Sequence, residues 1–136
     1  MKRVVLDTNV LVSGLLILQG PPARILQQFR DRRWILLLSG AILEEYGRVL
    51  RRKKFGLPFS RIQEMLDLIE RRSLRVIPSV HFNAIPQDPS DNEFLDVAVE
   101  GKADVIVSGD QYLLSLTTFQ GIMILSPSQF LNLRDF

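Results

Sequence analysis

Four acidic residues of this chain recur where the strands of a βαβ protein end, a pattern that could hold a metal ion. They are Asp7 in VVLDTNV, Glu45 in AILEEYGRVL, Asp91 in DPSDNEF and Asp110 in VIVSGDQYLL. Asp7 and Asp110 follow the most apolar short runs, which places them at the mouths of buried strands. Carboxylates a few Å apart repel one another unless a hard divalent cation binds their oxygens. The pattern therefore indicates an Mg²⁺ or Mn²⁺ site.

Such a site predicts metal-assisted hydrolysis of phosphodiesters. One or two bound ions can lower the pKa of a water, orient it in line with the phosphorus and stabilise charge on the leaving oxygen. Thr8, Asn9 and Ser108 stand beside the acids and are small enough to hold the carboxylates or metal waters.

The elements that must position these acids alternate between apolar strands and amphipathic helices. The predicted strands cover residues 3–6, 34–38, 74–77, 104–107 and 122–125. The predicted helices cover a stretch interrupted at Gly20-Pro21-Pro22 and resumed over 23–30, then 39–52, 60–72, 91–100 and 127–133, with Ser39 and Ser60 as N-caps. This order is typical of a three-layer α/β/α sandwich with a mostly parallel central sheet. In such a fold the strand-end acids meet at one edge of the sheet.

Helical periodicity selects among the other acids. Around the helix after Ser39, Glu45 lies at the border of the apolar stripe, whereas Glu44 points away from it. Glu45 is therefore the better site candidate.

The helix that follows Pro89 suggests a role for Asp91. Ser90 and Glu93 match a capping box, which makes Asp91 the first helical residue and puts it on the apolar face. Asp96 is predicted on the opposite, solvated face.

Three of these acids also have a purely structural interpretation. Asp7 can cap the helix after it, Asp91 can complement a helix N-terminus, and Asp110 can be a turn residue. The metal-site hypothesis is preferred because all the acids point to the same end of the sheet.

Length and composition limit the other possibilities. The 136 residues are predicted to form one domain over 1–136, without a linker or repeat. The absence of cysteine excludes disulfides and thiolate sites, and His81 alone is expected to be a polar loop residue. No apolar run approaches the length of a membrane span, and Asp7 interrupts any secretory signal, so a cytoplasmic location is expected.

The basic residues are clustered, and the formal net charge is +2. Arg48, Arg51, Arg52 and Lys53 are candidates for nucleic-acid contact. These residues and two further clusters all lie near the C-terminus of a predicted helix, where cations offset the helix dipole. The further clusters are Arg30, Arg32 and Arg33, and Arg71, Arg72 and Arg75.

Three segments together resemble the PIN-domain family, in particular its toxin–antitoxin branch of VapC-like ribonucleases. They are DTNVLVSGLL, SGAILEEYGRVL and DPSDNEFLDVAVEGKADVIVSGD. The resemblance implies an α/β/α sandwich and a Mg²⁺- or Mn²⁺-dependent endoribonuclease, inhibited by a small antitoxin protein. It implies the acids Asp7, Glu45, Asp91 and Asp110, with Ser108 at the family's small polar position, where threonine is also common. Asp88 is a reserve ligand in the loop before Asp91.

Other functions stay open. A haloacid-dehalogenase-like phosphatase needs a second aspartate where this chain has Asn9, and a receiver-like domain needs a lysine that SGDQYLL lacks. A PIN-like module that binds RNA or protein without cutting remains an alternative, as does a nuclease acting on DNA. A homodimer is another open alternative, because the apolar Phe55, Leu57 and Phe59 cluster near a helix junction.

Overall fold

A six-stranded sheet forms the centre of the protein, with the strand order β3–β2–β1–β4–β6–β5. The computed structural model describes residues 1–134. All neighbouring strands are parallel except β5 and β6, which are antiparallel. The strands are β1 (Arg3–Leu6), β2 (Ile35–Leu38), β3 (Leu74–Arg75), β4 (Val105–Val107), β5 (Thr118–Phe119) and β6 (Ile122–Leu125). The mostly parallel sheet confirms the predicted fold class.

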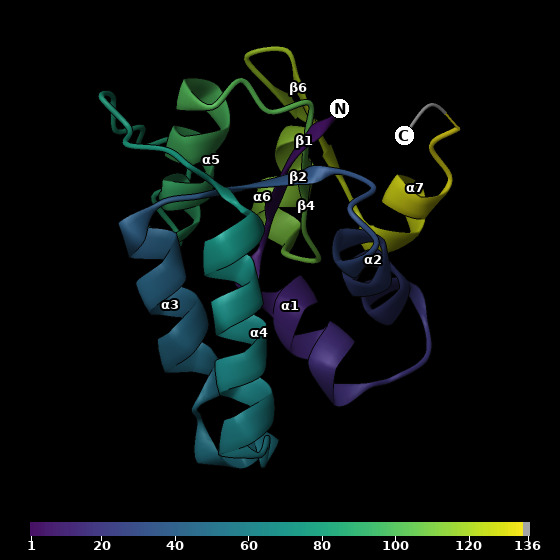
Figure 1. Ribbon diagram of the computed structural model, residues 1–136. Coiled ribbons are helices and arrows are strands. Elements are labelled where there is room, and N and C mark those ends of the chain that lie inside the picture. Colours follow the sequence, from purple (N-terminus) through teal and green to yellow (C-terminus); the bar gives the residue numbers. More distant parts are fainter. Residues whose placement is uncertain (135–136) are drawn as a thin grey trace.

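Helices cover the sheet as in a three-layer α/β/α sandwich. They are α1 (Thr8–Leu16), α2 (Pro21–Arg30), α3 (Gly40–Leu50), α4 (Phe59–Arg72), α5 (Asp91–Glu100), α6 (Gln111–Leu116), α7 (Pro127–Leu131) and the short 3₁₀ helix η1 (Lys53–Phe55). Helix α5 packs against β1, β2 and β4, whereas α4 packs against β2, and α1 packs against α2 and α3. Figure 1 shows the strands between α5 and the group formed by α1, α2 and α4.

The buried positions of the central strands β1 and β4 are apolar because both faces of the sheet are covered. Val4, Val5 and Leu6 of β1 are buried, and all three residues of β4 are fully buried. Helix α3 begins at the predicted cap, since the hydroxyl of Ser39 accepts a hydrogen bond from the amide of Ile42 at 3.1 Å. The strand ends and the helix caps together determine the positions of the acidic residues.

Two predicted boundaries were wrong, and two short elements were missed. Helix α4 begins at Phe59 after Pro58, not after Ser60, because the carbonyl of Pro58 already accepts from the amide of Ile62. The predicted strand 74–77 is only two residues long, and the chain leaves the sheet after the amide of Val76 bonds the carbonyl of Leu38. The short elements α6 and β5 were not predicted at all.

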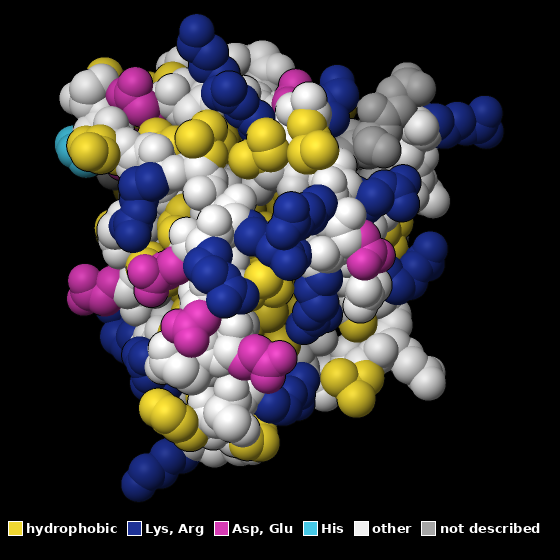
Figure 2. Space-filling model, viewed as in Figure 1, with side chains coloured by type: hydrophobic (Ala, Val, Ile, Leu, Met, Phe, Trp, Pro, Cys, Tyr) yellow, Lys and Arg dark blue, Asp and Glu magenta, His cyan; other side chains and the backbone are white. Residues whose placement is uncertain are grey.

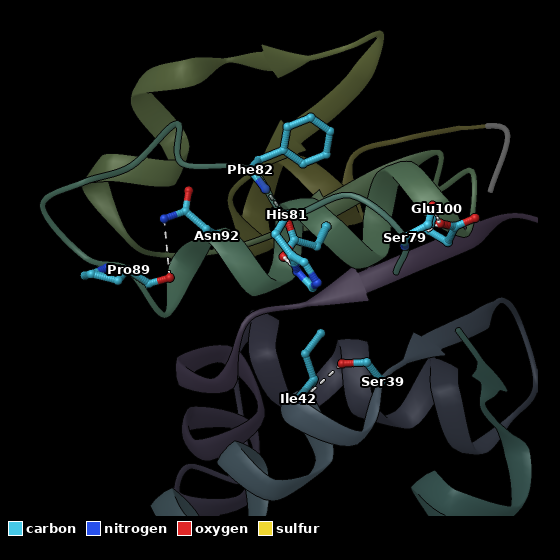
Figure 3. A network of polar contacts seen from close by, with 9 residues as sticks. Ser39, Ile42, Ser79, His81, Phe82, Pro89, Asn92 and Glu100 are labelled. Atoms are coloured by element: carbon cyan, nitrogen blue, oxygen red, sulfur yellow. Dashed lines mark hydrogen bonds and ion pairs between the residues drawn. The ribbon is translucent and has the colours of Figure 1, made fainter. Parts of the chain in front are cut away.

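Helix α5 holds a loop segment against its side, and this corrects the prediction for Asp96. We call residues 79–85 the strap. Asn92, Asp96 and Glu100 stand one turn apart on α5 and bind the strap in turn, as Figure 3 shows for Ser79 beside Glu100 and for His81 and Phe82 over the same helix. Asp96 was predicted to be solvated but is buried, because the strap covers its face of the helix.

The predicted capping box at the start of α5 is also absent. Ser90 has helical backbone angles. Its hydroxyl donates to Oδ1 of Asp88 at 2.6 Å and does not accept from the amide of Glu93. Asp91 is nevertheless the first residue of α5, as predicted. The hydroxyl of Ser90, which the sequence pattern assigned to a helix cap, therefore bonds the loop acid Asp88 instead.

Within residues 1–134, no single helix is long and apolar enough to cross a membrane, and only α1 and α2, bent by 97°, pass that test as a pair.

Candidate metal centre

The carboxyl ends of β1 and β4 lie side by side and bring Asp7 next to Ser108. Leu6 pairs with Val107, and the amide of Asp7 donates to the carbonyl of Val107 at 2.9 Å. The buried hydroxyl of Ser108 then donates to Oδ2 of Asp7 at 2.6 Å. Oδ1 of Asp7 accepts from the amide of Asn9 at 3.4 Å, so Asp7 also caps α1. The capping role and the site role are compatible in this residue.

Asp110 is fixed in the same way at the start of α6. Its Oδ1 accepts from the amides of Tyr112 at 2.7 Å and Leu113 at 3.3 Å, while its own amide donates to Ser108 at 2.9 Å. Ser108 therefore links both strand-end acids, because it donates to one carboxylate and accepts from the backbone of the other residue.

Three acids converge closely enough to share a cation. Asp88, Asp91 and Asp110 each offer a carboxylate oxygen, and these oxygens lie within 4.8 Å of one another. Asp91 is buried, whereas Asp88 and Asp110 are half-buried at its sides. Asp88 was only a reserve candidate, and the structure places it in this group, while Asp7 and Glu45 stand beside the group and not in it.

Asp91 carries the strongest electrostatic penalty of the site. Burial raises its pKa to about 8, and the negative charges of Asp110, Asp7 and Asp88 add to the effect. Its buried Oδ2 has no hydrogen-bond partner among residues 1–134. Asp91 thus combines a buried oxygen without a partner with a carboxylate that lies beside those of Asp88 and Asp110, and a divalent cation would compensate both features.

Asp7 is perturbed in the same direction by a smaller amount. Burial raises its pKa to about 6, the hydrogen bonds from Ser108 and Asn9 oppose the increase, and the charges of Asp110 and Glu45 add to it. The site as a whole therefore holds more negative charge than its own polar groups neutralise.

Glu45 enters the site from α3 and is held by Thr8. The hydroxyl of Thr8 donates a short hydrogen bond to Oε2 of Glu45 across the interface of α1 and α3. Glu45 is 9% exposed, whereas Glu44 is exposed, as the helical periodicity predicted. Asn9, by contrast, is exposed and contacts Asp7 only through its backbone amide.

Two residues of the site were missed in the sequence. Tyr46 is fully buried and donates its hydroxyl to the carbonyl of Leu6, which fixes α3 against the end of β1; burial raises its pKa well above the usual range. Glu93, assigned to a capping box, is half-buried, and burial together with the charge of Glu45 raises its pKa. The sequence signal for Tyr46 was its place in the apolar stripe of the helix. A tyrosine hydroxyl that is buried there needs a hydrogen-bond partner.

The basic candidates lie along and beyond α3. Arg48 is 61% exposed and approaches Oε1 of Glu45 at 3.9 Å. Arg51, Arg52 and Lys53 are exposed at the end of α3 and the start of η1. Among the contacts within residues 1–134, the one between this group and an acid of the site is made by Arg48.

Comparison with known proteins identifies the family of this chain. The family model of the PIN domain matches residues 3–112. An uncharacterised protein of Methanocaldococcus jannaschii is 36% identical over 117 residues, which cover 84% of this chain and 74% of that protein. The solved structure of VapBC2 from Rickettsia felis bound to a DNA fragment from their promoter has a similar fold, with a TM-score of 0.57 and 15% identity over 91% of this chain and 98% of that chain. Strand-end acids, sheet order and family model together lead to one conclusion: the chain belongs to the PIN-domain family.

Proposed function

We propose that this protein is a Mg²⁺- or Mn²⁺-dependent endoribonuclease and the toxin of a toxin–antitoxin pair. PIN domains are generally nucleases, and the chain shares their family model. The observation that carries the proposal is the unpartnered Oδ2 of Asp91 in a group whose carboxylate oxygens lie within 4.8 Å of one another.

The residues present fit a hard divalent cation. Asp88, Asp91 and Asp110 would hold it, with Asp7 and Glu45 beside them, and all of these donors are oxygens of the type that Mg²⁺ and Mn²⁺ prefer. Such an ion supplies a Lewis acid that activates water and stabilises negative charge on a phosphodiester.

Hydrogen bonds within the chain orient three of the carboxylates before any ion binds. Ser108 orients Asp7, the amides of α6 orient Asp110, and Thr8 orients Glu45. Groups that are fixed in advance lose little freedom when a cation and a substrate bind. Asp7 and Asp91 are the acids whose protonation opposes cation binding, because their raised pKa values favour the neutral form.

The partners of this function are part of the proposal. The exposed cations Arg48, Arg51, Arg52 and Lys53 would contact RNA phosphates near the acids. A toxin–antitoxin complex among the structures with this fold supports an antitoxin partner. Phe59 is 70% exposed while Phe55 and Leu57 are half-buried, which leaves Phe59 available to a second copy of the chain.

The test is cleavage of a mixed RNA, and of DNA of the same sequence, by wild type and Asp7→Asn with Mn²⁺ or with EDTA. We expect cleavage of RNA that requires Mn²⁺ and is lost in Asp7→Asn. Asp67→Asn removes an exposed acid of α4 and is the matched control. Cleavage that survives EDTA or the Asp7→Asn change contradicts the metal site, and RNA binding without cleavage by wild type indicates a binding module. Preferential cleavage of DNA assigns the other substrate.

Titration of wild type and Asp91→Asn with Mn²⁺ tests whether Asp91 binds the metal. Loss of both binding and cleavage in Asp91→Asn is the expected result. Unchanged Mn²⁺ affinity would show that the ion binds elsewhere.

A further inference from the structure

Arginines line three adjacent cavities between α2 and α4, on a face that the proposed metal centre does not use. The first cavity has a volume of about 330 Å³, and the other two are about 320 Å³ each. The first shares Arg30 and Arg61 with the second, and Arg71 and Arg72 with the third. Figure 2 shows Lys and Arg side chains gathered in a band across this face, over α4 and toward α2. The three cavities form one continuous basic surface.

We call this surface the arginine track. Its residues are Arg24, Arg30, Arg32, Arg61, Arg71 and Arg72. Among the described residues that line the three cavities, Glu64 is the one acid. Between Arg61 and Arg72 the track follows α4 for about 16 Å. A ligand that spans it would need several negative charges.

Helix dipoles do not account for all of these arginines. Arg30, Arg71 and Arg72 are in the last turns of α2 and α4, where a cation is favoured by the dipole. Arg24 and Arg61 are in the first half of the same helices, near the end that disfavours a cation. Their presence in the same cavities indicates a role beyond local helix stability.

Several guanidinium groups of the track are held in place by the protein. Arg61 donates to the carbonyl of Leu15 at 2.8 Å, and Arg72 donates to the carbonyl of Arg30 at 2.7 Å. Arg30 lies 3.7 Å from Sδ of Met65. Each of these contacts uses one N–H donor of a guanidinium group that has further donors. The group is therefore oriented by the protein and still able to bind an anion.

The track begins close to the proposed metal centre. Leu15, which Arg61 contacts, lies on α1, and the cap of α1 is Asp7. The distance along this helix is about 12 Å. A polymer bound at the acids could therefore continue onto the track.

We propose that the arginine track binds the phosphate backbone of single-stranded RNA and extends the substrate site of the nuclease proposed above, on which this inference rests. Cations that repeat along a groove suit a ligand whose negative charges repeat along its length, as phosphates do. An acidic peptide is the competing ligand, and the test separates the two.

The experiment measures binding of a labelled oligouridylate to the full chain in EDTA, over a range of salt concentrations. The variant R24Q/R71Q removes two exposed charges for which no structural hydrogen bond is described, so the fold is preserved. The matched control is Arg75→Gln, which removes an exposed arginine on β3 outside the three cavities. Circular dichroism checks that all three proteins are folded.

The expected result is weaker binding by R24Q/R71Q and a salt slope that falls by about 1.4, since each lost phosphate contact on a single strand removes about 0.7. Arg75→Gln should bind as wild type does. Equal affinity and slope for R24Q/R71Q and wild type overturns the proposal, and so does displacement of the RNA by polyglutamate more readily than by unlabelled oligouridylate. Binding is measured without metal and is therefore independent of cleavage. Arginine-dependent binding in EDTA together with no RNA cleavage in Mn²⁺ would contradict only the nuclease proposal. Cleavage in Mn²⁺ together with arginine-independent binding would contradict only this one.

Discussion

The hydroxyl of Ser108 donates a 2.6 Å hydrogen bond to Oδ2 of Asp7 and thereby joins the ends of β4 and β1. This bond favours the charged carboxylate and opposes the burial that raises the pKa of Asp7 to about 6. In Ser108→Ala we expect the pKa of Asp7 to rise further, so the acidic limb of the pH–rate profile moves to higher pH. Mn²⁺ affinity should fall by about 10- to 100-fold, the usual effect of removing a group that orients a ligand. Calorimetric Mn²⁺ titration and the pH dependence of RNA cleavage measure the two effects.

Ser108→Thr is the control, because it keeps a hydroxyl on the same carbon. Its pH–rate profile should stay close to that of wild type. A profile for Ser108→Ala that coincides with wild type would show that Ser108 acts only in packing.

Asp91 gives the metal-free protein an unusual dependence of stability on pH. Its pKa is raised from 3.8 to about 8 in the folded chain, so the native state binds a proton that the unfolded state releases between those values. Stability therefore falls as pH rises from about 4 to about 8 and is flat above that range. Asp7 contributes in the same direction up to about pH 6. Urea unfolding in EDTA should show that Asp91→Asn removes the slope between about pH 6 and pH 8.

Mn²⁺ provides the complementary measurement. A bound cation supplies the positive charge that compensates the buried carboxylate of Asp91. A ligand at about 100 times its Kd stabilises the native state by about 2.7 kcal/mol. Wild type should gain stability with Mn²⁺ at pH 8, and Asp91→Asn should gain much less. A slope that persists in Asp91→Asn would place the titrating group elsewhere.

The apolar strands and the acids at their ends were predictable because burial on both faces leaves a short apolar run in the sequence. VVL before Asp7 and VIV before Ser108 are such runs, and both form central strands. Glu45 was distinguishable from Glu44 because α3 is long enough for its period to be read. Helix α6 has six residues and β5 has two, so neither shows a period.

Asp96 could not be placed from its helix alone. A helical wheel assigns the face opposite the apolar stripe to solvent. Here the strap covers that face, and the amide of Phe82 and the ring of His81 contact Asp96. The pairing joins residues from different elements, which no local pattern records. Asp88 was predicted only as a reserve ligand for the same reason. Its place beside Asp91 and Asp110 depends on the path of the loop between the strap and α5.

The strap should loosen when Asp96 is removed. Oδ1 of Asp96 accepts from the amide of Phe82 at 2.7 Å, and Oδ2 contacts Nδ1 of His81 at 3.0 Å. Asp96→Ala leaves a partly buried amide without its acceptor, which costs about 1–3 kcal/mol. Urea unfolding should show this loss, and hydrogen exchange should show faster exchange at Phe82.

His81→Ala is the matched comparison, because the histidine side chain is 77% exposed and its pairing is screened by water. It should destabilise the protein less than Asp96→Ala does. Equal effects of the two changes would mean that the histidine contact, and not the amide of Phe82, holds the strap.

Glu45 and Glu44 offer a test within one helix, since they are adjacent, carry the same charge and differ in what surrounds them. Glu45 is buried against Thr8 and raises the pKa of Asp7 through its charge, whereas Glu44 is exposed. Glu45→Gln should lower Mn²⁺ affinity and RNA cleavage by at least about tenfold, and Glu44→Gln should change neither. Because glutamine still accepts from Thr8, the free energy of unfolding should stay close to that of wild type, so a loss of activity reports on charge and not on folding. If Glu45→Gln cleaves as well as Glu44→Gln, Glu45 serves to join α3 to α1 through Thr8, and the acids of the proposed metal centre are Asp7, Asp88, Asp91 and Asp110.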